Sequence, residues 1–184
     1  MRTFIAIDLE PALKEALARL VESLKRTKAD VRWVSMSGMH LTLKFLGETG
    51  AEGVSSVQEV LAKVVARHRA FSLVLAGTGS FPQGPAPRVL WAGVERQPAL
   101  LSLQEDIDRE LGSNGFPREE RAFHPHLTLG RVRGPAGVRE ASAELDKRAG
   151  SVLGQMEARK VSFIESLLGP GGARYRVISE HPLS

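Results

Sequence analysis

The tetrapeptide His-Leu-Thr-Leu occurs twice in this chain, at residues 40–43 and again at residues 126–129. Alternate side chains of a β-strand point to opposite faces, so each copy places its histidine and threonine on one face and its leucines on the other. The two copies are separated by close to half of the 184 residues. This spacing predicts two similar lobes related by an approximate two-fold axis, each with one copy on a half-buried strand.

Two such lobes would bring the repeated strands to one cleft, lined from opposite sides by His40, Thr42, His126 and Thr128. One neutral imidazole can take a proton from water while a protonated one gives a proton to a departing oxygen, and the reference pKa of about 6.5 makes both states accessible. Threonine hydroxyls can hold the non-bridging oxygens of a phosphodiester. The repeat therefore predicts metal-independent phosphate chemistry on an RNA-type substrate. The alternative is a chance repeat with two structural histidines.

The composition narrows the classes of protein that the chain can belong to. It contains no cysteine, which excludes disulfides, thiolate zinc sites and cysteine nucleophiles. The 25 Lys and Arg residues exceed the 21 Asp and Glu residues, and the net charge of +4 is compatible with a polyanionic partner but also typical of many soluble proteins. No apolar run approaches the roughly 18 residues of a membrane span. Asp8 and Glu10 lie where a signal peptide would be apolar. We expect a cytoplasmic protein that does not bind a membrane.

The rest of the pattern alternates strands with amphipathic helices and has no long linker. In the first strand, Phe4, Ala6 and Asp8 should share one face. Strands are predicted at residues 2–8, 31–34, 40–46, 71–75, 88–94, from 126 onward, 156–167 and 173–178. Helices are predicted from Pro11 to about residue 28, and at residues 54–65, 100–111 and 138–149, with a loop at 77–87 and a turn at 169–172. We therefore expect one domain, residues 1–184, made of two intertwined lobes.

Basic and potentially metal-binding side chains lie near the second copy. His124 and His126 have a spacing that could place two ligands on one metal, but Pro125 between them and the absence of further spaced ligands disfavour a metal site. Arg131 follows the second copy, so its forked donors could clamp a phosphate at the cleft rim; Arg133 has the same two interpretations, clamp or solvated strand end.

Several other side chains are interpreted as structural. Lys44 should share the face of His40, where an exposed strand lysine is favoured over a role in binding. Four aromatic residues could stack on a base, although a core or packing role is favoured for each: Trp33, Phe45, Phe81 and Phe123.

The chain resembles the two-histidine (2H) phosphoesterases, and within them the bacterial and archaeal RNA 2',3'-cyclic phosphodiesterases, also called 2'-5' RNA ligases. The similarity extends over the whole chain, in the segments RTFIAIDLEP, VRWV, MHLTLKFLGE, FPQGPAPRVLWAGV, FHPHLTLGRV and GARYRV. The paired H-x-T motifs are typical of the superfamily. Gly130 stands where relatives often carry a slightly larger residue.

The resemblance implies a bilobal α+β fold with two antiparallel sheets, related by pseudo-two-fold symmetry, that face a central cleft with helices on the outside. It also implies that His40 donates a proton to the leaving 3'-oxygen and that His126 accepts one from water. Thr42 and Thr128 would hold phosphate oxygens, and Arg131 matches an arginine implicated in this branch. The product would be a 2'-phosphate.

We therefore predict a hydrolase that opens RNA 2',3'-cyclic phosphate ends, needs no metal and no cofactor, and acts as a monomer. Its substrate would be an RNA end, with tRNA halves or small cyclic nucleotides as candidates. One alternative is 2'-5' ligation of the cyclic phosphate to a 5'-hydroxyl RNA, which uses the same histidines. Another is a non-catalytic module that binds RNA or nucleotides.

Overall fold

The computed structural model describes all 184 residues and contains nine strands, four α-helices and one short 3-10 helix. The strands are β1 (Arg2–Asp8), β2 (Val31–Trp33), β3 (His40–Glu48), β4 (Phe71–Phe81), β5 (Val89–Val94), β6 (His126–Val132), β7 (Val152–Ala158), β8 (Lys160–Gly169) and β9 (Gly172–Pro182). The helices are α1 (Pro11–Lys25), α2 (Ala51–Val65), α3 (Pro98–Gly112), α4 (Val138–Asp146) and the 3-10 helix η1 (Met36–Gly38). None of them is long and apolar enough to cross a membrane.

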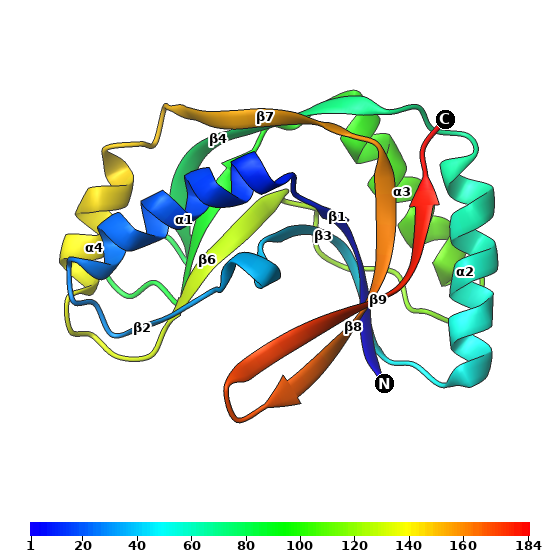
Figure 1. The fold of residues 1–184 in the computed structure, drawn as a ribbon, viewed down its shortest axis with the longest axis horizontal. Coiled ribbons are helices and arrows are strands. Elements are labelled where there is room, and N and C mark those ends of the chain that lie inside the picture. Colours follow the sequence, from blue (N-terminus) through cyan, green and yellow to red (C-terminus); the bar gives the residue numbers. More distant parts are fainter.

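The strands form two sheets, each of which holds one copy of the repeated tetrapeptide. The His40 sheet has the strand order β3-β1-β8-β9, and the His126 sheet has the order β2-β6-β5-β4-β7. Every paired neighbour is antiparallel. Helices α2 and α3 pack at the His40 sheet, whereas α1 and α4 pack at the opposite end of the molecule (Figure 1). The predicted α+β class with two antiparallel sheets is confirmed.

The order of elements repeats in the two sheets. The order β3-β1-β8-β9 corresponds to β6-β5-β4-β7, with β2 as an additional edge strand beside β6. Helix α1 follows β1 of the His40 sheet but contacts β7 of the His126 sheet, and α3 follows β5 of the His126 sheet but contacts β3 of the His40 sheet. In each half of the chain, the helix that follows a strand of one sheet therefore contacts the other sheet.

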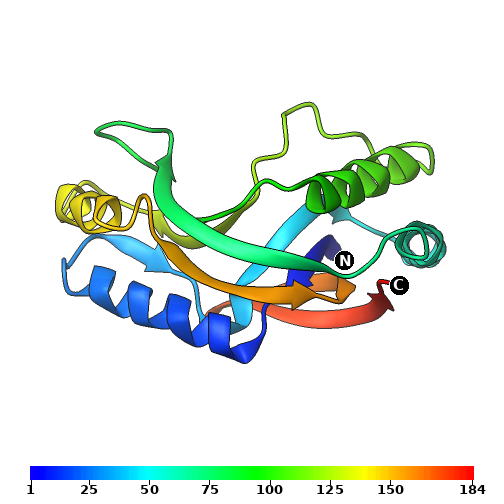
Figure 2. The ribbon, with the colours of Figure 1, turned by 90° about the horizontal axis from the view of Figure 1, so that it is seen from above.

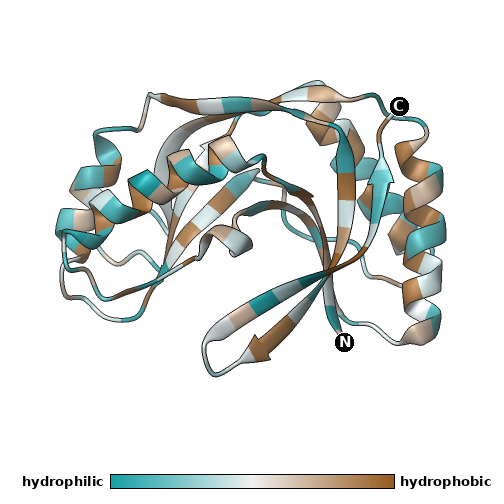
Figure 3. Cartoon of the chain, in the orientation of Figure 1, coloured by the Kyte–Doolittle hydropathy of each residue, from teal (hydrophilic) through white to brown (hydrophobic).

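One continuous core of 35 buried residues lies between the sheets and their helices. It takes in the leucines of both repeats, as the alternation predicts: Leu41, Leu43, Leu127 and Leu129. Hydrophobic and hydrophilic positions accordingly alternate along the strands (Figure 3). A separate small cluster of Phe4, Ala6 and Ile164, with Tyr175 packed against it, lies on the other face of the His40 sheet. We call the face of each sheet that carries its histidine and threonine the histidine face.

Two of the predicted segments, the strand 156–167 and the loop 77–87, differ from the structure. The predicted strand 156–167 is two strands, because β7 ends at Ala158 in the His126 sheet and β8 begins at Lys160 in the His40 sheet. A continuous strand pattern does not reveal a change of sheet at Arg159. The predicted loop 77–87 begins later, because β4 continues to Phe81 by pairing with β5. Position 79 of this strand is a glycine because the ring of Trp91 lies over it and leaves no room for a Cβ.

The predicted turn at residues 169–172 is confirmed, since Gly169 pairs with Gly172 at the tip of the β8–β9 hairpin. This hairpin extends away from the body of the molecule (Figure 1). Seen from above, the β4–β5 loop and the loop between α3 and β6 project on the same side (Figure 2).

Candidate active site

Both repeated strands contain a β-bulge at the fourth residue of the tetrapeptide. Opposite β1, the pairing passes from Thr42 directly to Lys44, and opposite β5 it passes from Thr128 directly to Gly130. A bulge inserts one residue and thereby exchanges the two faces of the strand beyond it. The residue five positions after each histidine, Phe45 or Arg131, therefore returns to the histidine face.

The bulge explains why the prediction for Lys44 was wrong. Its side chain is buried on the core side, where Nζ forms an ion pair with Asp108 of α3 and donates a hydrogen bond to the carbonyl of Pro117 at 2.8 Å. Asp108 also accepts hydrogen bonds from Arg118 Nε and from the backbone N–H of Glu119, each at 3.1 Å. This network ties the His40 strand to the loop that leads into the His126 strand.

The pKa of Asp108 lies below the ordinary value of an aspartate. Burial alone would raise the pKa of this carboxyl, but hydrogen bonds from Lys44, Glu119 and Arg118 outweigh it. The carboxylate is therefore charged at neutral pH. Its partners satisfy the oxygens that burial removes from water, which is the condition for a stable buried ion pair.

His40 lies at the start of β3, between two aromatic rings. It stacks on Phe4 of β1, with ring centroids 4.7 Å apart, and contacts the edge of Tyr175 of β9 at 5.1 Å. Burial between these rings lowers the pKa of His40 to about 4, whereas the nearby Asp8 carboxylate raises it and Lys14 lowers it. Asp8 is the cross-strand partner of His40. The free protein therefore holds this imidazole neutral at pH 7.

His126 also lies beside two aromatic rings. Phe81 of β4 meets it edge to face at 5.0 Å, and Trp91 of β5 lies at 6.5 Å. Its Nδ1 is 2.6 Å from the backbone carbonyl oxygen of His124, an acceptor, so Nδ1 carries the proton. In the neutral imidazole, Nε2 is then the unprotonated nitrogen, able to accept a proton. His124 therefore contacts His126 through its backbone carbonyl.

The remaining predicted site residues lie on the histidine faces. Thr42 and Thr128 are both half-buried and stand two residues after their histidines on the same side of the strand. Arg131 is exposed at the far end of β6. The repeated strands β3 and β6 approach each other, and the backbone N–H of Val34, in the segment that precedes β3, donates to the carbonyl of Leu129 at 2.9 Å.

The aromatic candidates divide between core and site. Trp33 packs on the core over Gly130, where a Cβ would lie 2.8 Å from its ring, and Phe123 also packs against the core. Phe45 does not belong to the core: it is 64% exposed on the histidine face, where its ring lies 6.1 Å from that of Phe4. Phe81 packs beside His126 and Trp91. The ring next to His40 is Tyr175, which the sequence pattern did not single out.

The other histidines have partners elsewhere. His68 Nε2 is 2.8 Å from Asp106 Oδ2, and His181 Nε2 is 2.9 Å from the hydroxyl of Ser179. His124 contributes its carbonyl to His126 and its residue is exposed. No group of three or more His, Asp or Glu side chains lies close enough together to hold a metal ion.

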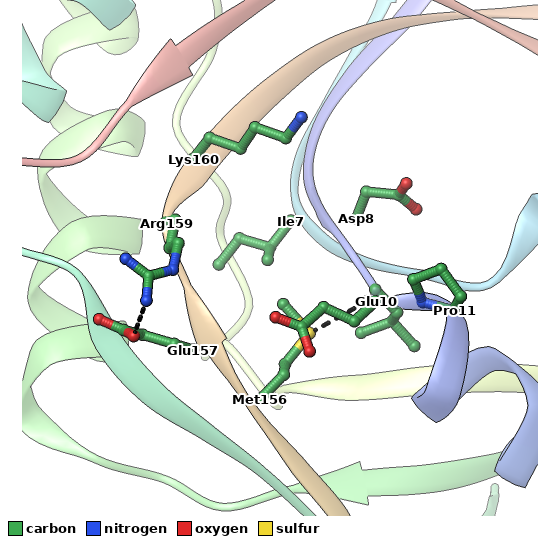
Figure 4. Close-up of a pocket in the computed structure, with 9 residues that line it drawn as sticks. Ile7, Asp8, Glu10, Pro11, Met156, Glu157, Arg159 and Lys160 are labelled. Atoms are coloured by element: carbon green, nitrogen blue, oxygen red, sulfur yellow. Dashed lines mark hydrogen bonds and ion pairs between the residues drawn. The ribbon is translucent and has the colours of Figure 1, made fainter.

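A separate pocket of about 290 Å³ lies where β1 leads into α1, beside the junction of β7 and β8 (Figure 4). All but one of its charged side chains are paired, Asp8 with Lys14 at 2.8 Å, Lys160 with Glu180 at 2.6 Å, and Arg159 with Glu157, whereas Glu10 forms no ion pair. Asp8 is the residue that connects this pocket with His40. The pairing leaves neither cation that lines the pocket, Arg159 or Lys160, free to bind an anion.

The family of the protein follows from comparison with known proteins. The family model described as the 2'-5' RNA ligase superfamily matches residues 5–167. The chain belongs to this superfamily. A relative from Methanothermobacter thermautotrophicus, named RNA 2',3'-cyclic phosphodiesterase, is 36% identical over 176 residues and matches over 95% of each chain. A protein of the same name from Thermotoga maritima is 41% identical over 133 residues, 72% of this chain and 71% of the relative.

Solved structures of other proteins show the same fold. TT0787 of Thermus thermophilus superposes with a TM-score of 0.85 at 26% identity, covering 100% of this chain and 98% of the other. Apo LigT of E. coli gives a TM-score of 0.80 at 25% identity, covering 100% and 97%. LigT has also been solved in complex with 3'-AMP, with a TM-score of 0.78 to this chain. These similarities agree with the resemblance based on the H-x-T motifs.

Proposed function

We propose that this protein is an RNA 2',3'-cyclic phosphodiesterase that opens the cyclic phosphate at the end of an RNA chain to a 2'-phosphomonoester. The observation that carries the proposal is the duplicated His-Thr pair, set at the same register before a bulge on the histidine face of each sheet. The names of the relatives support it, since those from M. thermautotrophicus and T. maritima are both named for this activity.

In the proposed reaction, His126 acts as the general base. Its Nε2 takes a proton from water as the water oxygen bonds to phosphorus, and the Nδ1 hydrogen bond to His124 holds the ring in the tautomer that this step needs. The bond between phosphorus and the 3'-oxygen breaks, and His40 gives a proton to that oxygen. Each histidine thus transfers one proton: His126 gains one and His40 loses one. The product keeps its phosphate on the 2'-oxygen.

The other proposed site residues act on the charge of the phosphate. Thr42 and Thr128, beside the two histidines, would donate hydrogen bonds to the non-bridging oxygens, which become more negative in the transition state. Arg131, five residues after His126, would add a forked, permanently charged donor. We propose no metal and no cofactor. Residues 1–184 would act as one monomeric domain of two intertwined lobes, each of which supplies one half of the site.

The role of His40 as proton donor predicts a change in its pKa on binding. With a pKa of about 4, about one molecule in a thousand carries the proton at pH 7. A bound phosphate anion should raise this pKa, because it favours the charged imidazolium. We expect NMR titration of the histidine ring protons, assigned with His40→Gln, to show a pKa near 4 in the free protein. Saturation with a nucleoside 2'-monophosphate should raise it by at least one unit. No rise on binding would contradict the donor role of His40.

The proposed function is tested with a defined RNA that ends in a 2',3'-cyclic phosphate. We expect the protein to convert it to the 2'-phosphate, identified by chromatography against 2'- and 3'-phosphate standards, and to do so with EDTA present. A 3'-phosphate product, or no reaction, would overturn the proposal. Adding excess 5'-hydroxyl RNA tests 2'-5' ligation, in which that hydroxyl replaces water as the nucleophile. Binding without any turnover would indicate the non-catalytic module instead.

A further inference from the structure

Two arginines face each other directly on the histidine face of the His126 sheet. Arg32 of β2 is the cross-strand partner of Arg131 of β6, and both are exposed. Their neighbours Val31 and Trp33 pack on the core side, so the side chains of the two arginines point away from the core together. The sequence pattern points to Arg131 but not to Arg32, because pairing between β2 and β6 is not visible in the sequence.

This pair lacks a negatively charged partner within the protein. The ion pairs of the chain engage Arg133 with Asp30 at 3.2 Å and Arg176 with Glu165 at 2.6 Å, but neither Arg32 nor Arg131 takes part in one. The residue opposite Arg131 on its other side is the apolar Val89. Like charges placed directly opposite in a sheet repel each other. An anion between the two guanidinium groups would relieve that repulsion and accept hydrogen bonds from both.

The position of the pair separates it from the two His-Thr pairs. Arg131 lies three residues beyond Thr128, roughly 10 Å along the strand, a distance that its long side chain can partly span, whereas Arg32 lies on the next strand, further from Thr128. Arg32 reaches toward the β8–β9 hairpin, where its Nη2 lies 3.2 Å from the position of a Cβ on Gly172. Arg32 therefore connects the edge of the His126 sheet with the hairpin of the His40 sheet.

We propose that Arg32, together with Arg131, binds the internucleotide phosphate of the nucleotide that precedes the cyclic end. This inference rests on the proposed function, and it specifies the substrate class: an RNA chain is preferred over a cyclic mononucleotide, which lacks that phosphate. Arg131 lies between the His-Thr pairs and Arg32, so it can bind both the cyclic phosphate and the preceding internucleotide phosphate. Arg32 binds only the internucleotide phosphate. Arg32 is thus a specificity-determining residue.

The test compares Arg32→Ala with the wild-type protein on two substrates, an RNA pentanucleotide with a 2',3'-cyclic end and the 2',3'-cyclic mononucleotide. We expect the ratio of kcat/KM for the RNA to kcat/KM for the mononucleotide to fall by roughly tenfold, the effect of one charge-assisted hydrogen bond. The dependence of RNA binding on salt should also become shallower, by about 0.7 in the logarithmic slope. Arg19→Ala is the matched control, since Arg19 is an arginine on the outer helix α1. It should change neither quantity.

The inference is overturned if the ratio does not change, either because Arg32→Ala lowers kcat/KM on neither substrate, or because it lowers both equally, which would place Arg32 at the reacting phosphate. Direct binding keeps this result separate from the proposed function. Fluorescence anisotropy with a 5'-labelled RNA that ends in a 2'-phosphate measures the same contact without catalysis. If the wild-type protein opens neither cyclic substrate but Arg32→Ala still weakens RNA binding by roughly tenfold, the proposed function fails and the phosphate site stands.

Discussion

Replacing either His40 or His126 with alanine is expected to lower kcat on a 2',3'-cyclic RNA end by about 10²- to 10⁴-fold, the usual contribution of a general acid or base. Each histidine moves one of the two protons in the proposed reaction, so each loss should be large. Turnover is measured from the 2'-phosphate formed under saturating substrate. Because the two groups act in one step, the double variant should be little slower than the slower single variant.

His124→Ala is the matched control for these variants. It removes an imidazole two residues from His126 but keeps the backbone carbonyl that accepts the Nδ1 hydrogen bond. Its activity should stay within about twofold of the wild-type protein, because the carbonyl that fixes the tautomer of His126 is kept. Thermal unfolding of all variants separates loss of chemistry from loss of folding. Unchanged turnover in His40→Ala or His126→Ala, in a folded protein, would remove the basis of the mechanism.

Asp108→Leu is expected to destabilise the protein by about 3–5 kcal/mol, because it leaves the Lys44 ammonium buried without its carboxylate. For a chain of this size that corresponds to a fall in Tm of roughly 10 °C. Chemical denaturation at pH 7 measures the change in the free energy of unfolding. The low pKa of Asp108 means that this stability is present at neutral pH. In the wild-type protein it is lost as the pH falls through the pKa of the folded carboxyl.

The double variant Lys44→Met with Asp108→Leu distinguishes an unpaired charge from lost packing. Replacing both partners by apolar side chains of similar volume should recover most of the lost stability, since no charge is left buried. Arg118 keeps a partner in both variants, because its Nη2 is 2.6 Å from Glu105. If the double variant is as unstable as Asp108→Leu alone, the defect lies in the packing of α3 against β3.

Much of the candidate site could be predicted from two short stretches of sequence. Strict alternation in His-Leu-Thr-Leu correctly assigned the leucines to the core, and it placed His40 with Thr42 and His126 with Thr128. The prediction held because it depends only on the geometry of a strand, in which the side-chain period is two. It failed one residue later, at Lys44, because a bulge depends on how the neighbouring strand pairs.

The sequence by itself determined the strand character of the two repeats, the side chains that share a face, and the absence of thiol chemistry. Only the tertiary structure decided what surrounds those side chains. Tyr175 beside His40, Arg32 opposite Arg131 and Asp108 beneath Lys44 all come from segments distant in the chain. The physical reason is that local pattern fixes the direction of a side chain along its own strand. Its neighbours, and with them its pKa and its charge partners, depend on which strands and helices the fold brings together.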